Sequence, residues 1–221
     1  MKSYFFILLS LFTFYVNAQN ESLSKSSVIS TPPISSSTFS ISKAFFNNAF
    51  AKYEIKDYRA AILDYTNAIK HRPQYEAAYF NRGLSKYELR DFYGAIADFN
   101  FVIRNNPNHI GGYLTRGSAK GKLGDNYGAI SDYSMVIELD PNHADAYYNR
   151  GNSKAALLDF DDAIVDFSKA IEIDPNHGLS YFMRGLTKLE LDIKESGCLD
   201  LSKAGELGYD KAYVGIREYC K

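Results

Sequence analysis

The sequence repeats itself at a fixed interval, the one that separates Pro73 from Pro107. Four prolines carry this spacing, and a glycine, an alanine and an isoleucine recur in step with them. These positions are Pro73, Pro107, Pro141 and Pro175; Gly83, Gly117, Gly151 and Gly185; Ala61, Ala95, Ala129 and Ala163; and Ile69, Ile103, Ile137 and Ile171. A fixed period of this length indicates stacked copies of one supersecondary unit. Such units form an extended surface rather than a closed catalytic pocket, so the period constrains function as well as fold.

Each copy carries the apolar spacing of two helices. In the second copy, apolar or small residues fall every three or four positions from Tyr79 to Leu89, and again from Phe92 to Ile103. Asp91 stands just before the second run, where it can cap a helix. Pro107 ends that run, because proline disfavours helix for the residue before it. The unit is therefore predicted to be a helical hairpin, copied in tandem.

The hairpin resembles the tetratricopeptide repeat. That family carries an aromatic residue early in the first helix and Gly or Ala four residues later. Its second helix carries Ala, an aromatic residue and Ala, and a proline follows. In the fourth copy these positions hold Tyr147, Gly151, Ala163, Phe167, Ala170 and Pro175. The resemblance implies an all-α fold, a right-handed α-solenoid of antiparallel helix pairs, with a concave groove lined mostly by first helices.

The same resemblance divides the chain after residue 41. Five repeats are expected within residues 42–207. Their boundaries are 42–75, 76–109, 110–143, 144–177 and, for a divergent fifth copy, 178–207. Residues 208–221 are expected to form a C-terminal capping helix, which covers the apolar face that no sixth repeat buries.

The residues before the repeats have a different composition. Lys2 is followed by an apolar run from Tyr4 to Val16, and the run ends in Val16-Asn17-Ala18. This pattern predicts a signal peptide over residues 1–18, since the run is shorter than the ~20 residues of a membrane-spanning helix. Residues 19–41 are rich in serine, which predicts a disordered linker, with a hidden partner-binding motif as the alternative. We expect export to the periplasm, cell envelope or exterior, without stable membrane insertion after cleavage.

Charged residues also follow the period. An arginine precedes each repeated glycine where the family usually has Leu, a lysine follows three residues after it, and an aspartate recurs in the second helix. They are Arg82, Arg116, Arg150 and Arg184; Lys86, Lys120, Lys154 and Lys188; and Asp64, Asp98, Asp132, Asp166 and Asp200. One interpretation is a ladder of Arg–Asp–Lys contacts between helices, since partly buried charges need partners. The alternative is a basic stripe that grips acidic ligands. The ladder is favoured.

The sequence offers no arrangement for catalysis or metal binding. His109, His143 and His177 share one repeat position, and a zinc site needs three or four ligands at one point, which copies spread along a solenoid do not provide. No glycine-rich nucleotide loop is present. We expect no enzyme activity, no cofactor and no metal. The net charge of -1 lacks the basic excess typical of nucleic-acid binders, so no nucleic-acid partner is expected.

The two cysteines, Cys198 and Cys220, lie near the C-terminus. Predicted helices over 196–207 and 211–219, with Gly208 between them, form an antiparallel hairpin that brings the cysteines near each other. In an exported protein this favours a disulfide. Two separate thiols, or a metal-binding pair that lacks further ligands, are the alternatives.

The predicted function is a non-catalytic scaffold that binds a peptide or protein segment in its groove. The resemblance places these residues there: Phe46, Phe50, Phe80, Asn81, Leu84, Tyr87, Leu114, Ser118, Tyr148, Asn149 and Phe182. Phe80, Leu84 and Leu114 are expected to be exposed and to have no core role. The alternative function is a structural part of an envelope or secretion assembly that docks through its convex face or tail. The sequence does not indicate an oligomeric state.

Overall fold

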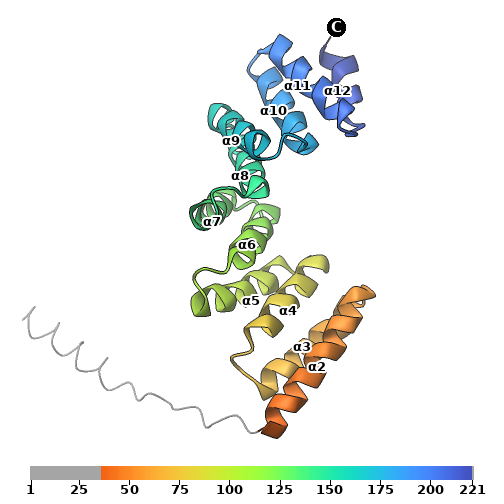
Figure 1. Ribbon diagram of the computed structural model, residues 1–221, viewed down its shortest axis with the longest axis vertical. Coiled ribbons are helices and arrows are strands. Elements are labelled where there is room, and N and C mark those ends of the chain that lie inside the picture. Colours follow the sequence, from red (N-terminus) through yellow and green to blue (C-terminus); the bar gives the residue numbers. More distant parts are fainter. Residues whose placement is uncertain (1–35, 221) are drawn as a thin grey trace, which may run out of the picture. The chain divides into compact units, whose positions relative to one another are not determined.

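The computed structural model describes residues 36–220, and its regular elements there are all α-helices (Figure 1). In chain order they are α2 (Ser36–Glu54), α3 (Tyr58–His71), α4 (Glu76–Glu88), α5 (Phe92–Asn105), α6 (Ile110–Lys122), α7 (Asn126–Leu139), α8 (Ala144–Ala156), α9 (Phe160–Ile173), α10 (Gly178–Glu190), α11 (Lys194–Glu206) and α12 (Ala212–Tyr219). The predicted signal peptide and linker residues 19–35 lie outside the described residues. None of the described helices is long and apolar enough to cross a bilayer.

The helices pack in sequential pairs. We call α2, α4, α6, α8 and α10 the first helices and α3, α5, α7, α9 and α11 the second helices. Each first helix packs on the second helix that follows it, and each pair packs on the next. Across pairs, first helices contact one another, whereas among the described residues no such contact joins two second helices. The pairs follow one another along an arc (Figure 1), and the first helices line its inner side. The predicted all-α solenoid is confirmed.

The repeated glycines are packing sites. A Cβ on Gly83 would lie 2.7 Å from a ring carbon of Phe99, and a Cβ on Gly117 would lie 2.8 Å from the ring of Tyr133. In a helix interior, glycine is less stable than alanine by ~1 kcal/mol. That loss is tolerated because the missing side chain lets the two helices of a pair approach closely. The interpretation of these glycines as packing residues is confirmed.

Side chains of the loops cap both sets of helices. The carboxylate of Asp91 accepts a hydrogen bond of 2.9 Å from the backbone N–H of Gly94 at the start of α5. His109 does the same for α6, since its Nδ1 accepts from the N–H of Gly112 at 2.8 Å. The equivalent histidines of the next two repeats cap α8 and α10 in the same way. The repeated histidines are thus helix N-caps.

The linker prediction was too long at its C-terminal end. Helix α2 begins at Ser36, six residues before the expected start of the first repeat. The hydroxyl of Ser42, which is buried, donates to the carbonyl of Phe39 at 2.9 Å. The guanidinium of Arg72 lies 5.3 Å from the ring centroid of Phe39. These contacts stabilise an extra helical turn that the serine-rich composition does not indicate.

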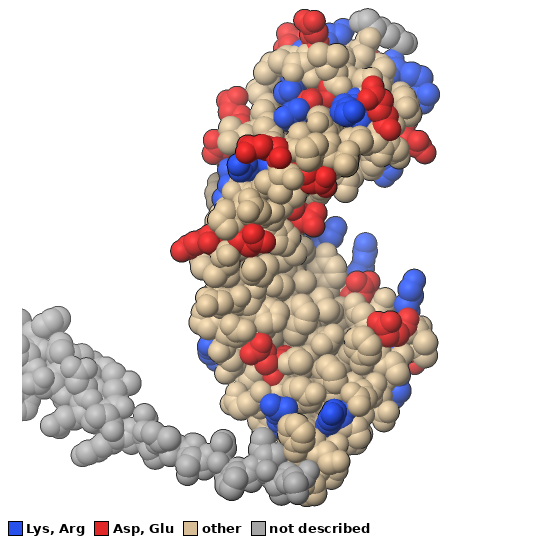
Figure 2. All heavy atoms as spheres, in the orientation of Figure 1, with Lys and Arg blue, Asp and Glu red and all other residues tan. Residues whose placement is uncertain are grey.

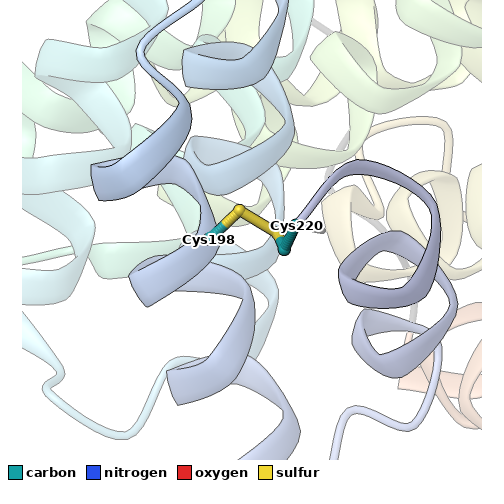
Figure 3. The surroundings of a disulfide bond; sticks show 2 residues. All are labelled: Cys198 and Cys220. Carbon is teal, nitrogen blue, oxygen red and sulfur yellow. A yellow bond between two sulfur atoms is a disulfide. The ribbon is translucent and has the colours of Figure 1, made fainter.

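The C-terminal end forms the expected helical hairpin. Cys198 on α11 and Cys220 just after α12 are joined by a disulfide, with their Cα atoms 5.8 Å apart (Figure 3). Helix α12 begins at Ala212, one full sequence period after Gly178, where α10 begins. It therefore occupies the place of the first helix of a sixth repeat.

Candidate functional site

The recurring charges form a ladder inside the solenoid. Asp132 is 2% exposed, and its carboxylate accepts hydrogen bonds from Nε and Nη2 of Arg116. The Nζ of Lys120 lies 2.9 Å from the same carboxylate. The same triad repeats around Asp98, Asp166 and Asp200. The first repeat keeps only a lysine–aspartate pair, 2.6 Å apart.

Each arginine of the ladder also contacts the preceding repeat. Nη1 of Arg116 donates to Oδ1 of Asn100 on α5 at 2.6 Å, and Nη1 of Arg82 donates to the hydroxyl of Thr66 on α3 at 3.1 Å. Each guanidinium also lies 5.2 to 5.5 Å from the ring centroid of the tyrosine one turn earlier. The arginines and lysines are thus engaged by the protein itself. The ladder interpretation is confirmed, and the basic stripe for acidic ligands was wrong.

Two cavities open between the first helices of the second, third and fourth repeats. The central cavity, about 300 Å³, is lined by Tyr87, Ser118, Gly121, Lys122, Asn126, Tyr133, Asn149, Asn152 and Ser153. The side cavity, about 220 Å³, is lined by Leu84, Tyr87, Glu88, Thr115 and Ser118. The two cavities share Tyr87 and Ser118, so they are neighbours on the inner side of the arc.

The central cavity is lined mainly by neutral polar groups. The hydroxyls of Ser118 and Tyr133 lie 3.2 Å apart. Burial raises the pKa of Tyr133 to about 12, and the bond to Ser118 opposes part of that rise. Burial also raises the pKa of Tyr87, with a smaller contribution from the adjacent Glu88. Both phenols therefore stay protonated at neutral pH, and they offer hydrogen bonds rather than a catalytic base.

One amide in the central cavity is not fully paired. Burial raises the pKa of the Tyr148 hydroxyl, and its hydrogen bond with the side-chain amide of Asn152 opposes that rise. The Oδ1 of Asn152 is buried and has no hydrogen-bond partner among the described residues. Buried polar atoms usually have a partner, and this oxygen, which solvent does not reach, is one of two exceptions among the described residues.

Neither charged patches nor clusters of potential metal ligands indicate a second binding site in the described part of the chain. Among residues 36–220, no group of three or more His, Cys, Asp or Glu side chains is placed to hold a metal ion. On the face drawn in Figure 2, acidic and basic side chains are interspersed, and neither sign forms a continuous patch. The central and side cavities are the candidate binding site on the inner side of the arc.

Four of the predicted groove residues line the cavities: Leu84, Tyr87, Ser118 and Asn149. Two others, Phe50 and Asn81, are absent from both linings. Phe50 is 45% exposed, and the Asn81 amide donates to the carbonyl of Ala77 in its own helix.

The remaining predicted groove residues share one position of the first helix and pack against the protein. They are Phe46, Phe80, Leu114, Tyr148 and Phe182. The ring centroid of Phe80 lies 5.9 Å from that of Phe99 and 4.9 Å from that of His109. Leu114 packs against the buried cluster that contains Tyr113 and Val136. The expectation that Phe80 and Leu114 have no core role was wrong, because residues at this position contact the start of the next repeat.

Sequence reasoning missed five residues of the central cavity in addition to the buried Tyr133. They are Gly121, Lys122, Asn126, Asn152 and Ser153. Gly121 and Asn126 interrupt a pattern of aromatic residues seen in the earlier copies, and that interruption was a signal that the sequence contained.

Comparison with known families identifies the repeat. Profiles described as "Tetratricopeptide repeat" match residues 48–110 and 144–177, and one described as "TPR repeat" matches residues 117–157. Together they cover more than half of the chain. No curated protein sequence matches the chain.

Solved structures share the fold. MamA (residues 41 to end) from Desulfovibrio magneticus RS-1 is 20% identical, with a TM-score of 0.72 over 75% of this chain and 94% of that chain. YrrB, a TPR protein with an unusual peptide-binding site, is 20% identical, with a TM-score of 0.67 over 79% and 90%. TTC0263, a thermophilic TPR protein from Thermus thermophilus, is 18% identical, with a TM-score of 0.61 over 78% and 99%. At these identities the likeness shows the fold alone.

Proposed function

We propose that this chain, which belongs to the tetratricopeptide repeat family, is a non-catalytic scaffold that binds a peptide or protein segment on the inner side of its arc. The fold resembles that of protein-interaction scaffolds. One structural relative, YrrB, is a TPR protein with an unusual peptide-binding site, which supports a peptide as the partner.

The central cavity is the observation that carries this proposal. Residues from three consecutive first helices meet there, and its neighbour, the side cavity, extends it along the arc. Amides and hydroxyls of the lining can pair with the N–H and C=O groups of an extended chain. Lys122 and Glu88 are the charged residues of the two linings, one of each sign. A segment of low net charge therefore fits best.

Export is part of the proposal. The apolar run after Lys2 and the Val16-Asn17-Ala18 sequence support a cleaved signal peptide. The partner would then be a protein of the periplasm, envelope or exterior. Intact-mass analysis of the natively expressed protein checks this step, since cleavage after Ala18 predicts a mature chain that begins at Gln19.

Panning a random peptide library against the purified chain tests the binding surface. Ser118→Arg places a long side chain between the two cavities, whereas Ser131→Arg makes the same change at an exposed position of α7. Enriched peptides should bind the parent and the Ser131→Arg protein alike. We expect Ser118→Arg to weaken binding at least about tenfold, equivalent to ~1.4 kcal/mol. Circular dichroism should show equal helical content in all three proteins.

A structural role in an assembly is the second candidate, and exposed rings on the second helices favour it. Tyr93 and Tyr127 share one repeat position and are 76% and 75% exposed. A photo-crosslinking residue placed at position 127 should then capture a partner in the native envelope, and one placed at position 118 should not. The reverse result supports the peptide-binding scaffold.

A further inference from the structure

Helix α2 exposes a face that the other first helices bury. Each of those helices packs on the second helix of the preceding repeat, whereas no described helix precedes α2 (Figure 1). On α4, Ala78 is completely buried, in one cluster with Ala61 and Ala68 of α3. The equivalent residue of α2, Ala44, is exposed. The exposed face of α2 is therefore the one that receives a helix in every later repeat.

Asn48 lies on the same face and departs from the repeat pattern. The four later repeats carry an arginine at this position. Arg82, for example, binds Asp98 of its own repeat and also reaches back to Thr66 on α3. The first repeat has the short, neutral Asn48 instead, and it is exposed.

The exposed residues of this face follow a helical period. They are separated alternately by three and four positions, and we call them the α2 face: Ile41, Ala44, Asn48, Ala51 and Ile55. Ile41 and Ile55 are 42% and 75% exposed. Ile55 follows the last residue of α2, and its N–H donates to the carbonyl of Ala51 at 3.4 Å, so it continues the same turn. The residue types read the same in both directions from Asn48.

We propose that the α2 face of a second copy of this chain covers it, in an antiparallel helix pair with a two-fold axis at Asn48. This inference goes beyond the proposed function, because it does not involve the inner cavities. A two-fold interface must be complementary to itself. In this pair Ile41 meets Ile55 of the second copy, and Ala44 meets Ala51, where small side chains allow close approach.

Asn48 suits the centre of such a pair. An amide both donates and accepts, so the two copies of Asn48 can form hydrogen bonds with each other. A single polar residue in an apolar helix interface also fixes its register. An arginine here, as in the later repeats, would instead place two like charges at the axis.

The charges beside the α2 face favour the antiparallel orientation. Lys43 and Glu54 are exposed, and neither is part of an ion pair among the described residues. Lys43 lies five residues before Asn48 and Glu54 six residues after it. The antiparallel pair therefore brings Lys43 of each copy to nearly the same height as Glu54 of the other, on the same side. A parallel pair would instead set each charge beside its own copy.

The small size of the α2 face predicts a weak dimer. Stable interfaces usually bury about 800 Å² per partner, with about 20–30 residues on each side, and one helix face supplies far fewer. We therefore expect a dissociation constant on the order of 100 µM.

Sedimentation equilibrium of the purified chain, from about 10 to about 500 µM, tests for this dimer. Asn48→Arg should weaken it at least about tenfold, because it adds two like charges at the axis. The new arginine can bind Asp64 as Arg82 binds Asp98, so the urea midpoint should not fall. A parent that stays monomeric would overturn the proposal, as would an Asn48→Arg protein that dimerises like the parent.

A charge exchange tests the orientation. Lys43→Glu alone should weaken the dimer, and so should Glu54→Lys alone, because each places like charges opposite one another. The double variant should restore the affinity of the parent. No recovery in the double variant would contradict the antiparallel pair.

A matched pair of alanines locates the interface. Ala44→Arg should abolish the dimer, whereas Ala97→Arg makes the same change at an exposed position of α5 and should leave it intact. Equal dimerisation of these two variants would place the interface elsewhere.

A photo-crosslinking residue at position 51 identifies what covers the α2 face. We expect crosslinks to a second copy, near Ala44. Crosslinks near Ala51 of a second copy would indicate a parallel pair. Crosslinks to residues 19–35 of the same chain, or to a different protein in the native envelope, would show another occupant. Each of these three results would overturn the proposal.

Discussion

Arg116 and Asp132 lie 16 residues apart and are joined by two hydrogen bonds, 2.9 Å from Nε to Oδ2 and 2.5 Å from Nη2 to Oδ1. The third guanidinium nitrogen of Arg116 donates to Asn100, 16 residues in the other direction. One side chain thus connects α5, α6 and α7. Because equivalent arginines recur in the second, fourth and fifth repeats, buried polar contacts as well as apolar packing fix how each repeat meets the next.

Asp132→Ala should strongly destabilise the protein. It leaves Arg116 and Lys120 without their shared carboxylate, and breaking a buried ion pair typically lowers stability by ~3–5 kcal/mol. The two cationic side chains remain 17% and 20% exposed, so water compensates in part and we expect a loss near the lower end of that range, ~3 kcal/mol. Urea unfolding followed by circular dichroism measures the change.

Asp161→Ala is the matched control, because it removes an exposed aspartate in the first turn of α9. It should change stability by no more than ~1 kcal/mol. A triple variant, Arg116→Met, Lys120→Met and Asp132→Leu, should recover much of the loss, since apolar residues can replace a buried charge network. If Asp132→Ala unfolds at the same urea concentration as the parent, the ladder does not stabilise the fold.

Two buried tyrosines at one repeat position should respond in opposite directions to loss of their hydroxyls. The Tyr65 hydroxyl has no partner among the described residues, whereas that of Tyr133 lies 3.2 Å from the Ser118 hydroxyl. Phe99 and Phe167 occupy the equivalent positions, so a phenyl ring fits there. Tyr65→Phe should raise stability by ~1 kcal/mol, and Tyr133→Phe should lower it by a similar amount. Parallel urea melts of the two variants and the parent decide this. A loss of stability in Tyr65→Phe would contradict it.

Stability should fall at alkaline pH, partly because of Tyr133. Burial raises its pKa from 10.0 to about 12, so the folded state favours the neutral phenol. Below pH 10, both folded and unfolded chains keep the proton, so this group does not lower the stability. From about pH 10 to about pH 12 the unfolded chain releases the proton first, and stability falls by up to ~1.4 kcal/mol per pH unit for this group. Tyr133→Phe should reduce the dependence of the urea midpoint on pH between 9 and 11. An identical dependence in the variant and the parent would show that Tyr133 does not contribute.

The helical solenoid and the ladder could be predicted because both follow the period of the sequence. A recurring aspartate at a fixed distance from a recurring arginine indicates a contact in every copy, and the structure contains it. The start of α2 could not be predicted in this way. Ser36 precedes the first copy, and its helix depends on contacts with the end of α3 rather than on the repeat pattern.

The groove residues were only partly predictable. A family pattern assigns a residue to the inner side of the arc, but it does not say whether the next repeat covers it. The Phe46 ring lies 5.0 Å from Tyr75, and the Phe80 ring lies 4.9 Å from His109. Both contacts join the middle of a first helix to the loop that leads into the next repeat, so they depend on how consecutive repeats pack. Replacing Phe80 by Ser is therefore expected to lower stability, contrary to the expectation from the sequence. The central cavity, by contrast, lies where the third copy departs from the others.

The disulfide should stabilise the C-terminal end locally. Helix α12 occupies the place of a first helix, but the position that holds Arg184 in the fifth repeat holds Glu218 here. A carboxylate cannot donate the hydrogen bonds of the ladder, and the disulfide between Cys198 and Cys220 joins α12 to the second helix before it instead. The closed loop spans 22 residues, for which chain entropy gives a stabilisation of ~3 kcal/mol.

Reduction should therefore increase hydrogen exchange in α12 and α11 first and leave α4 to α9 protected, because solenoid stability is a sum of repeat and neighbour terms. Exchange measured by mass spectrometry with and without reductant gives the result directly. The double substitution Cys198→Ala with Cys220→Ala is the control: it should reproduce the effect of the reductant and make the protein insensitive to it. Uniform loss of protection along all repeats would show that the cap is coupled to the whole solenoid. Two thiols that can be labelled in the native protein under oxidising conditions would show that packing of Ala212 and Gly215 against α11 and α10 holds α12 without the bond.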